Sequence, residues 1–263
     1  DLNIINTCAV KTPTEHRMVH KIKQFDSHSK PLIVAGCLAQ AQSDIVIKNS
    51  DKASLIGPNA IHDIVKVTKK TLNNQRSIHL ENNRKTKSWL PRIRQNPIVN
   101  IIEVANGCGL HCSYCITKNA RGKLMSYPQE LILSEMRASA DLGCLEYWIT
   151  SQDNACYGID INSSLPNLMN GITSIDNDFK VRIGMMSPLY VKRIVDELVQ
   201  CYQNNKFFKF LHLPIQSGSS RILNLMRRGH DEKLPLEIIK KFRSVLPEIT
   251  VSTDIIIGFP TET

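Results

Sequence analysis

The sequence has no apolar run approaching the roughly 18 residues that a membrane-spanning helix needs, and no charged-then-apolar leader opens it. It also lacks internal repeats, which excludes collagen-like and coiled-coil classes. With 263 residues, of which 42% are hydrophobic, a chain disordered throughout is excluded as well. We therefore expect a folded, non-secreted, cytoplasmic protein that forms one large domain or two smaller ones.

Both ends of the sequence are unusual. The chain begins at Asp1 instead of a methionine, and it stops at Thr263, soon after the apolar run 255–259. A complete protein seldom ends beside what reads as a buried strand. We therefore interpret the sequence as a fragment that is cut at both ends.

Acidic residues are scarce from Ile64 to Arg94, where Glu81 is the only one. Nine basic residues against this one give the segment a balance of +8, out of +9 for the chain: Lys66, Lys69, Lys70, Arg76, Arg84, Lys85, Lys87, Arg92 and Arg94. A solvated helix face and a basic linker would explain the run. Its concentration in one segment favours a polyanionic partner such as nucleic acid. Trp89 could stack on a base there or only anchor the linker.

Short apolar runs alternate with helical patterns along the chain, which predicts parallel sheets in an α/β fold. The expected strands are 2–7, 31–36, 53–57, 98–105, 145–150, 180–186, 207–213 and 249–257. A polar, basic stretch separates the third strand from the fourth and marks a domain boundary. We predict a truncated N-terminal parallel-sheet α/β domain (1–75), a basic linker (76–96) and a truncated, partial (β/α)6 barrel (97–263). An open, doubly wound sheet is the alternative to the barrel.

Three of the eight cysteines have the spacing Cys108-x-x-x-Cys112-x-x-Cys115, after the first strand of the second domain. A disulfide framework does not suit a chain with a sizeable core and no leader. Zinc competes, but its structural sites take four ligands, and no fourth cysteine or well-spaced histidine completes the set, although His111 is adjacent. Three thiolates on a tight loop favour a [4Fe–4S] cluster with one iron left open to a small molecule.

Two further cysteines occupy equivalent positions. Cys8 and Cys37 each follow an expected strand of the first domain. Because the carboxyl ends of parallel strands meet at one edge of a sheet, the pair predicts a second metal site. For either one alone, a buried inert thiol would be the better interpretation. Cys144, Cys156 and Cys201 have no such spacing, and we interpret them as packing residues.

The run 108–115, Cys-Gly-Leu-His-Cys-Ser-Tyr-Cys, resembles the cluster loop of the radical S-adenosylmethionine (SAM) enzymes, in which an aromatic residue, here Tyr114, precedes the last cysteine. The resemblance implies that Cys108, Cys112 and Cys115 are catalytic and hold a [4Fe–4S] cluster, whose fourth iron binds SAM. It also implies that an electron from the cluster cleaves SAM into methionine and a 5′-deoxyadenosyl radical. The protein's share is to orient SAM and to exclude water.

The two sites together resemble those of the methylthiotransferases, whose N-terminal domain holds an auxiliary [4Fe–4S] cluster on three cysteines. Cys8 and Cys37 match the second and third of these, and the first would lie upstream of Asp1. Several segments are most similar to the archaeal and eukaryotic enzymes that act on N6-threonylcarbamoyladenosine in tRNA: 90–97, 116–128, 149–153 and 157–158. Two more, 213–219 and 254–263, are shared more widely among methylthiotransferases.

The resemblance also implies binding residues after several expected strands, on the face where barrel enzymes build their sites. Those for SAM are Tyr114, Gln152, Asp153, Arg182, Ser187 and Gly258, and those for the substrate are Arg121, Gln216 and Ser217. Gln152 and Asp153 would contact polar groups of the cofactor, and Arg182 its carboxylate. Each has a plainer interpretation, as a loop residue that satisfies local backbone groups or, for Arg121, as a surface arginine.

The implied function is a tRNA methylthiotransferase that converts N6-threonylcarbamoyladenosine at position 37 to its 2-methylthio form. One SAM would methylate a sulfur on the auxiliary cluster, and a second would yield the radical that removes hydrogen from C2 of the adenine. That adenine lies in a single-stranded loop, so reaching it costs little unpairing energy. The partners would be tRNA and unidentified electron and sulfur donors. Alternatives are the same chemistry on isopentenyladenosine or on a ribosomal protein, and a non-catalytic Fe–S RNA-binding module.

Overall fold

The computed structural model describes residues 1–81 and 85–263, and the chain divides into two compact units. The first unit comprises Asp1–Lys85 and Tyr114–Lys123, and the second comprises Thr86–Ser113 and Leu124–Thr263. Arg84, counted above in the basic segment, lies outside the described residues. Among the helices of the described part, none is both long and apolar enough to cross a membrane.

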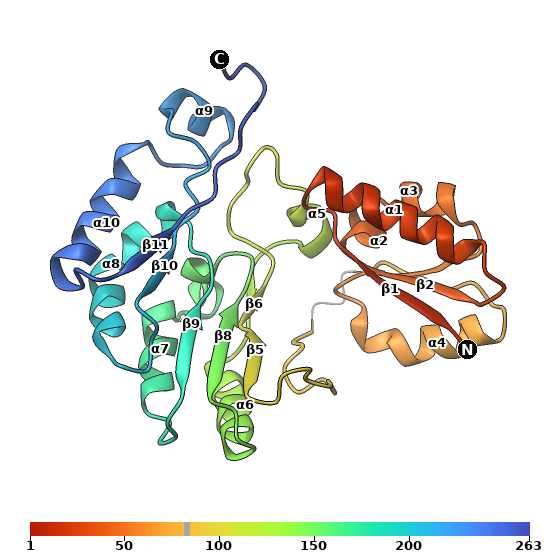
Figure 1. The fold of residues 1–263 in the computed structure, drawn as a ribbon, viewed down its shortest axis with the longest axis horizontal. Helices are drawn as coiled ribbons and strands as arrows, with labels where there is room; N and C mark the ends of the chain where they lie inside the picture. Colours follow the sequence, from red (N-terminus) through yellow and green to blue (C-terminus); the bar gives the residue numbers. More distant parts are fainter. Residues whose placement is uncertain (82–84) are drawn as a thin grey trace. The chain divides into compact units, whose positions relative to one another are not determined.

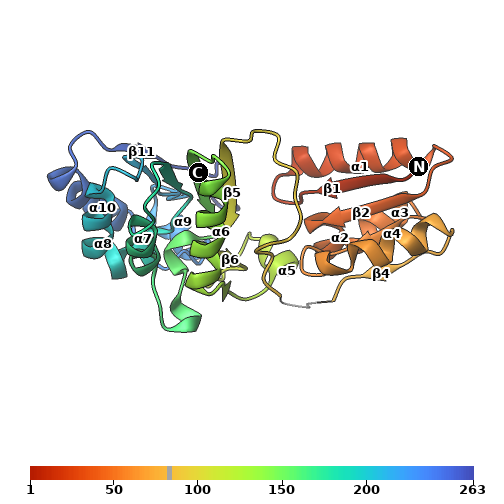
Figure 2. The ribbon, with the colours of Figure 1, turned by 90° about the horizontal axis from the view of Figure 1, so that it is seen from below.

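The first unit is built on a four-stranded parallel sheet in the order β1-β2-β3-β4. Its strands are Asn3–Thr7, Leu32–Gly36, Ser54–Ile56 and Ile78–His79. Its helices are α1 (Thr12–Asp26), α2 (Cys37–Ala41), α3 (Ser43–Asn49), α4 (Ile64–Leu72) and α5 (Thr117–Arg121), with a 3-10 turn at Ile61–Asp63. Figures 1 and 2 show α1 running alongside β1 and β2.

Successive residues of a strand point to opposite faces of the sheet, and in this sheet both faces are buried. On β2, Leu32 and Val34 pack in a core with residues of α1, α2 and α3. Ile33, between them, packs in a second core with Val67 of α4, and Figure 1 shows α4 on the other side of the strands from α1. A parallel sheet covered on both faces confirms the predicted α/β class.

The second unit contains a row of parallel strands and an antiparallel pair. The row consists of β5 (Val99–Glu103), β8 (Glu146–Thr150), β9 (Lys180–Ile183), β10 (Phe210–His212) and β11 (Thr250–Ser252); the pair is β6 (Ala105–Asn106) and β7 (Met125–Ser126). Its helices are α6 (Gln129–Asp141), α7 (Leu165–Thr173), α8 (Pro188–Gln203), α9 (Ser220–Leu225) and α10 (Lys233–Val245), with 3-10 turns at Asn154–Cys156 and Ile159–Ile161. The backbone N–H of Phe208 donates to the carbonyl of Val181 at 3.0 Å and so links β9 to the segment before β10.

Helices cover one side of this row. Tyr147 and Ile149 of β8 are buried on the helical side, and the Tyr147 hydroxyl donates to the Met136 carbonyl of α6 at 2.9 Å. Trp148, between them, is 36% exposed on the other side. Figure 1 shows α6, α7, α8 and α10 along the outside of the strands. Parallel strands with helices on the outer side form part of a (β/α) barrel, as predicted.

Three predicted strands end earlier than the apolar runs that predicted them. The run 249–257 forms a strand only at Thr250–Ser252, and the run 207–213 only at Phe210–His212. The run 180–186 ends its strand at Ile183. In each case the apolar residues continue into the loop after the strand, so hydrophobicity alone does not mark the strand end.

Candidate active site

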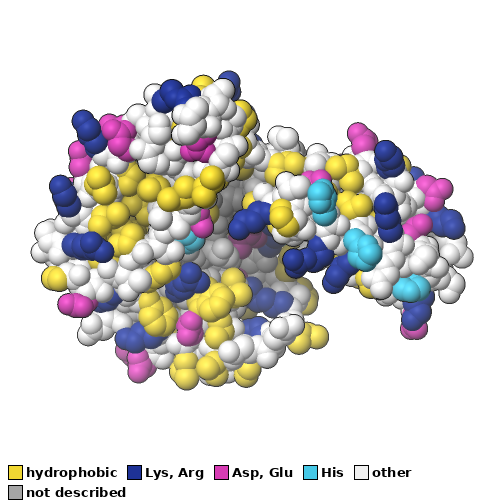
Figure 3. Space-filling model, turned by 45° about the horizontal axis from the view of Figure 1, so that its top comes forward, with side chains coloured by type: hydrophobic (Ala, Val, Ile, Leu, Met, Phe, Trp, Pro, Cys, Tyr) yellow, Lys and Arg dark blue, Asp and Glu magenta, His cyan; other side chains and the backbone are white. Residues whose placement is uncertain are grey.

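Five loops follow the carboxyl ends of the parallel strands in the second unit. They span residues 104–113, 151–154, 184–187, 213–219 and 253–258. Because parallel strands point the same way, these loops gather at one end of the row, where barrel enzymes bind their substrates. Figure 3 shows the second unit hollowed, with hydrophobic and basic side chains lining the hollow.

Cys108 and Cys112 lie in the first of these loops, and both side chains are partly exposed. The backbone N–H of Leu110 donates to the Cys108 sulfur at 3.3 Å, and Nη1 of Arg228 donates to the Cys112 sulfur at 3.4 Å. Such donors suit deprotonated thiolate ligands. Within residues 1–81 and 85–263, no three His, Cys, Asp or Glu side chains are grouped as around a metal ion. The donor chemistry nevertheless fits an iron–sulfur ligand loop, and the ligand assignment stays a prediction.

Cys156, which the sequence indicated only as a packing residue, lies against the cluster loop. Its side chain is completely buried, its thiol donates to the Asp153 backbone carbonyl at 3.1 Å, and the Cys108 side chain is its other hydrogen-bonding neighbour. The contact with Cys108, followed by burial, raises the pKa of the Cys156 thiol. Cys156 is therefore a neutral thiol next to a predicted thiolate ligand. Its isolated position in the sequence gave no signal of this contact.

Gly109 brings the cluster loop close to α8. A Cβ atom at this glycine would lie 2.3 Å from the hydroxyl oxygen of Tyr190 and 3.0 Å from its Cζ. Real Cβ atoms do not approach that closely, so any side chain here would displace the ring or the loop. Burial, followed by the nearby Cys156 and Cys108, raises the pKa of Tyr190.

Asp153 and Ser187 connect the loops after β8 and β9. The Asp153 carboxylate is 1% exposed and accepts hydrogen bonds from Ser187 and from the backbone N–H of Ala155 at 3.1 Å. Burial raises the pKa of Asp153, while the bonds from Ser187 work in the opposite direction. Ser187 begins α8 as its N-cap residue, but its hydroxyl bonds Asp153 instead of capping the helix. The predicted contact of both residues with SAM stays a prediction, since each is engaged with the other.

The neighbouring residues offer polar groups of another kind. The side-chain oxygen of Gln152 accepts from the backbone N–H of Gly107 at 2.6 Å, which ties this loop to the start of the cluster loop. Ser151 Oγ and Asn154 Oδ1 are buried, and neither has a hydrogen-bond partner in the described part of the chain. Because buried polar atoms are normally hydrogen-bonded, these two suit a bound polar ligand. Asn154 was missed by the sequence analysis.

Arg182 projects from the exposed side of β9, next to Trp148. Its guanidinium carbon lies 5.6 Å from the centre of the Trp148 ring and 4.8 Å from that of Phe210. These cation–π contacts fix the side chain on the face opposite the helices. The predicted contact of Arg182 with the carboxylate of SAM stays a prediction.

The loops after β10 and β11 hold the remaining predicted residues of this unit. Gln216 has a positive φ of 75° and pairs through its backbone with Asp254 and Ile256, each at 2.9 Å. The Ser217 hydroxyl accepts from Ser219 N at 3.2 Å. Gly258 also has a positive φ, 76°, and no atom lies within 4 Å of the place of a Cβ there.

His212 and Asp254 are in hydrogen-bonding contact at the same end of the strands. Nε2 of His212 lies 2.9 Å from Oδ2 of Asp254. His212 is the last residue of β10, and Asp254 follows the neighbouring parallel strand β11. The two side chains therefore meet at the predicted site. Position 212 lies near the end of the predicted strand 207–213, and the sequence did not predict this pairing.

Cys8 and Cys37 lie at the corresponding end of the first unit's sheet. Thr7 of β1 and Gly36 of β2 are partners in the strand register. Cys8 directly follows Thr7, and Cys37 directly follows Gly36, so the two cysteines follow the paired ends of neighbouring strands. Gly36 has φ 97°, and a Cβ there would lie 2.5 Å from the Thr7 carbonyl oxygen. Only glycine allows the two chains to approach this closely. The close approach supports the predicted second metal site, which stays a prediction.

The last cluster cysteine, Cys115, belongs to the first unit. Ile116, directly after it, packs in the same core as Cys37, and α5 follows. Arg121 ends α5, and its carbonyl accepts from the Asn59 side chain at 3.3 Å. Tyr114, before Cys115, is 36% exposed. The predicted roles of Tyr114 and Arg121 stay predictions.

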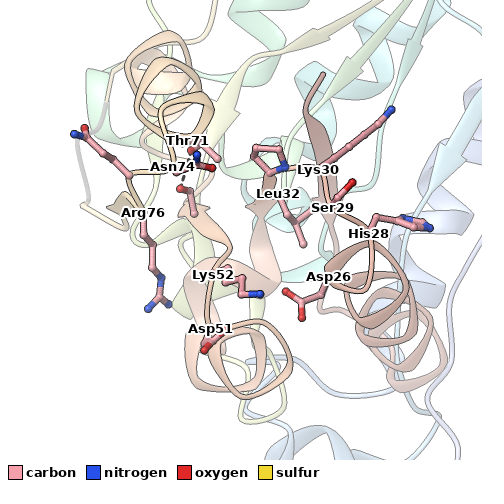
Figure 4. A pocket seen from close by; sticks show the side chains of 13 residues that line it. Asp26, His28, Ser29, Lys30, Leu32, Asp51, Lys52, Thr71, Asn74 and Arg76 are labelled. Carbon is pink, nitrogen blue, oxygen red and sulfur yellow. Dashed lines mark hydrogen bonds between the residues drawn. The ribbon is translucent and has the colours of Figure 1, made fainter.

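A hollow of about 400 Å³ lies at the opposite edge of the first unit's sheet, where its strands begin. Figure 4 shows its polar lining, which includes Asp26, Lys30, Lys52 and Arg76. Lys30 pairs with Asp1 at 3.1 Å, and Nε of Arg76 donates to the Ala53 carbonyl at 3.1 Å. No cysteine lines this hollow, so it is separate from the predicted metal site.

Two family matches cover most of the chain. Residues 102–263 match the Radical SAM superfamily. Residues 1–57 match the uncharacterized protein family UPF0004. The first match contains the five loops and the three clustered cysteines, and the second contains Cys8 and Cys37.

Curated relatives match the whole chain. It is 41% identical to the "Probable threonylcarbamoyladenosine tRNA methylthiotransferase" of Methanothermobacter thermautotrophicus, over 100% of this chain and 62% of the relative. It is 36% identical to the threonylcarbamoyladenosine tRNA methylthiotransferase of Drosophila melanogaster, over 100% of this chain and 49% of the relative. The chain thus spans about half to three fifths of the length of these relatives.

Among solved structures, the radical S-adenosylmethionine methyltransferase TsrM from Kitasatospora setae is similar, with a TM-score of 0.70 and 14% identity. The match covers 99% of this chain and 57% of that one, and at this identity it shows a shared fold. The fold, the cysteine spacing and the family match over residues 102–263 agree: the chain belongs to the Radical SAM superfamily.

Proposed function

We propose that the intact protein is a tRNA methylthiotransferase that converts N6-threonylcarbamoyladenosine at position 37 to its 2-methylthio form. The observation that carries this proposal is similarity along the entire chain, 36–41% identity, to archaeal and eukaryotic relatives that bear that name. The cluster loop and the pair Cys8 and Cys37 supply the two cysteine sites that such an enzyme needs. The enzyme would meet its tRNA in the cytoplasm, which remains a prediction.

Cys108, Cys112 and Cys115 would hold a [4Fe–4S] cluster, and Cys8 and Cys37 would contribute to a second one. With SAM bound, the first cluster supplies the one-electron chemistry needed to break an unactivated aromatic C–H bond. General-base chemistry does not suit that bond, because its hydrogen is not acidic. The donor set fits this assignment, since Leu110 and Arg228 already donate to the two sulfurs in the second unit.

The chain's own residues then position and shield the cofactor. The buried Ser151 hydroxyl would accept from, or donate to, its polar groups, and the buried Asn154 Oδ1 would accept from them. Asp153 and Ser187 hold the loops after β8 and β9 at fixed positions. Arg182, held by the rings of Trp148 and Phe210, presents a positive charge on the open side of the strands.

Recognition of tRNA would use exposed cations. Several positive charges of the basic segment are occupied within the fold: Lys87 pairs with Glu103 at 3.1 Å, and Arg92 with Glu135. Arg94 donates to the Cys144 sulfur at 2.8 Å. On α4, in contrast, Lys66, Lys69 and Lys70 are exposed, and no ion pair of theirs is found in the described residues. Figure 3 shows further basic and histidine side chains on the first unit.

Nucleoside analysis of tRNA from a deletion strain tests the proposal. We expect 2-methylthio-N6-threonylcarbamoyladenosine to disappear, its unthiolated precursor to accumulate, and the intact gene to restore the product. An unchanged amount of the 2-methylthio nucleoside would overturn the proposal. Loss of 2-methylthio-isopentenyladenosine, or of methylthiolation on a ribosomal protein, would reassign the substrate. Absence of 5′-deoxyadenosine after anaerobic reconstitution and reduction would favour a non-catalytic RNA-binding module.

A further inference from the structure

We propose that Arg228 is a positioning residue for the predicted radical cluster: its guanidinium fixes the Cys112 ligand, and its charge makes the cluster easier to reduce. The inference rests on the proposed function in one respect, the assignment of Cys112 as an iron ligand. The contacts themselves are properties of the chain.

Arg228 is unusually placed for an arginine, with only 4% of its surface exposed. Arginine is rarely buried unless its guanidinium is paired, and two of the nitrogens of Arg228, Nη1 and Nη2, have partners here. Here Nη1 lies 3.4 Å from the Cys112 sulfur, and Nη2 donates to the Pro214 carbonyl at 2.9 Å. The guanidinium thus spans from the cluster loop to the loop after β10.

The backbone around Arg228 binds the same loop. Ser113, directly after Cys112, donates its N–H to the Met226 carbonyl at 3.0 Å and its hydroxyl to the Leu225 carbonyl at 2.8 Å. Both carbonyls belong to the end of α9 and the turn before Arg228. The two hydrogen bonds from Ser113 to these backbone carbonyls therefore fix the cluster loop. The guanidinium contact adds a buried positive charge at the Cys112 sulfur.

The charge of Arg228 also acts on Asp153. Asp153 is buried, and desolvation raises its pKa, while the charge of Arg228 is among the influences that lower it. Arg228 thus lies near one buried acid and one predicted thiolate ligand. Asp153 is joined in turn to Cys156, whose thiol donates to the Asp153 backbone carbonyl at 3.1 Å.

The expected effect follows from electrostatics. Reduction adds a negative charge to an iron–sulfur cluster, and hydrogen bonds and positive charges at its sulfurs stabilise that form. The effect is strengthened in a buried site, where water screens the charge poorly. Removing the charge of Arg228 should therefore disfavour reduction, whereas a lysine at this position, which keeps the charge, should disfavour it less.

The test is a redox titration of the intact protein, reconstituted anaerobically with iron and sulfide and followed by electron paramagnetic resonance. A Cys8→Ala/Cys37→Ala background leaves the radical cluster as the only one measured. We expect Arg228→Gln to lower the ratio of reduced to oxidised cluster about tenfold at a fixed potential, which is ~59 mV for one electron. Arg228→Lys should recover part of the loss. Arg227→Gln is the matched control, because Arg227 is the exposed neighbour and the same charge is removed.

An unchanged potential in Arg228→Gln with full iron content would overturn the inference. If Arg228→Gln does not retain its iron, Arg228→Lys decides: a reduced fraction below that of the parent supports the inference, because lysine lacks the planar fork that reaches both the Cys112 sulfur and the Pro214 carbonyl, and an unchanged potential overturns it. A parent protein that takes up no cluster at all would instead contradict the proposed function, because the assignment of Cys112 would fail before Arg228 is tested.

Discussion

Ser187 binds the buried carboxylate of Asp153 twice, through its backbone N–H to Oδ1 at 3.0 Å and through its hydroxyl to Oδ2 at 2.5 Å. The two residues lie 34 positions apart and join the loops after two neighbouring strands. Because the carboxylate is removed from water, each of these bonds offsets part of the cost of burying its charge.

Substitution Ser187→Ala should therefore destabilise the fold by about 2 kcal/mol at neutral pH, because a buried acceptor loses a donor. Urea denaturation measures this loss. Ser174→Ala is the control: its exposed hydroxyl bonds only the Gly171 carbonyl, at 2.7 Å, so a change below about 0.5 kcal/mol is expected. Equal losses in the two variants would show that the buried contact has no special weight.

The loss in Ser187→Ala should also depend on pH. The pKa of Asp153 is raised above its ordinary value of 3.8, chiefly by burial, so the folded chain holds the proton more tightly than the unfolded chain. The stability from this group is full below the unfolded pKa and is lost as the pH rises through the folded pKa. The Ser187 bonds reduce that loss, so removal of its hydroxyl should cost more at pH 7 than near pH 4. A cost that does not change with pH would contradict this account.

Gly109→Ala should disturb the packing of α8 against the cluster loop. The new methyl group would overlap the Tyr190 hydroxyl, and overpacking of this kind costs about 1–3 kcal/mol. Tyr190→Phe removes the oxygen, so the double variant should regain part of the stability lost in Gly109→Ala. A double-mutant cycle from urea denaturation measures this coupling. Gly218→Ala, where a Cβ meets nothing within 4 Å, should be nearly neutral; a similar loss there would refute the steric explanation.

The two cysteine sites should separate functionally in the intact protein. Cys112→Ala should stop both SAM cleavage and methylthiolation, because the proposed radical cluster would lose a predicted ligand. Cys8→Ala should stop methylthiolation and leave SAM cleavage. Formation of 5′-deoxyadenosine and of the modified nucleoside are the two measurements. Cys201→Ala, which removes a thiol bonded to the Pro166 carbonyl, serves as the control. Equal loss of both activities in Cys8→Ala would contradict the division of labour.

The three exposed lysines of α4 should contribute to tRNA affinity. Changing Lys66, Lys69 and Lys70 to glutamine should weaken binding. It should also make the slope of log K against log salt concentration shallower by roughly two to three, since each phosphate contact releases counterions. Fluorescence anisotropy over a range of salt concentrations measures both. Lys240→Gln, at an exposed position on α10, is the control. An unchanged salt dependence in the triple variant would move the RNA surface elsewhere.

Arg92→Gln should behave differently from the α4 lysines, although all belong to the basic segment. Arg92 donates to the Ile101 carbonyl at 3.1 Å and pairs with the buried Glu135. Its loss should lower stability, because Glu135 is left without its cation. Thermal unfolding would detect this, and a variant as stable as the parent would show that the pair contributes nothing.

The sequence predicted most of the parallel strands, because buried parallel strands are continuous apolar runs. It missed β4, the short strand Ile78–His79, which lies in the predicted linker 76–96. It also located the cluster loop and the loops around it, since these follow such strands. It could not predict contacts set by tertiary packing: Cys156 with Cys108, or Arg228 with Cys112, which lie 116 residues apart. The basic segment shows the same limit, because only the fold distinguishes Lys87 and Arg92, which are paired internally, from the exposed lysines of α4.

The position of α5 has a consequence for biosynthesis. Ala120 is buried and Ile116 packs against the core of the first unit, and both belong to the segment Tyr114–Lys123, while the rest of that unit precedes Thr86. On the ribosome, the sheet of that unit is complete long before these residues emerge. Its core must then stay open until Arg121 has been translated, while the first strand of the second unit is already available. The first unit should therefore close late, and a chain cut after Lys85 should expose apolar surface and require a chaperone.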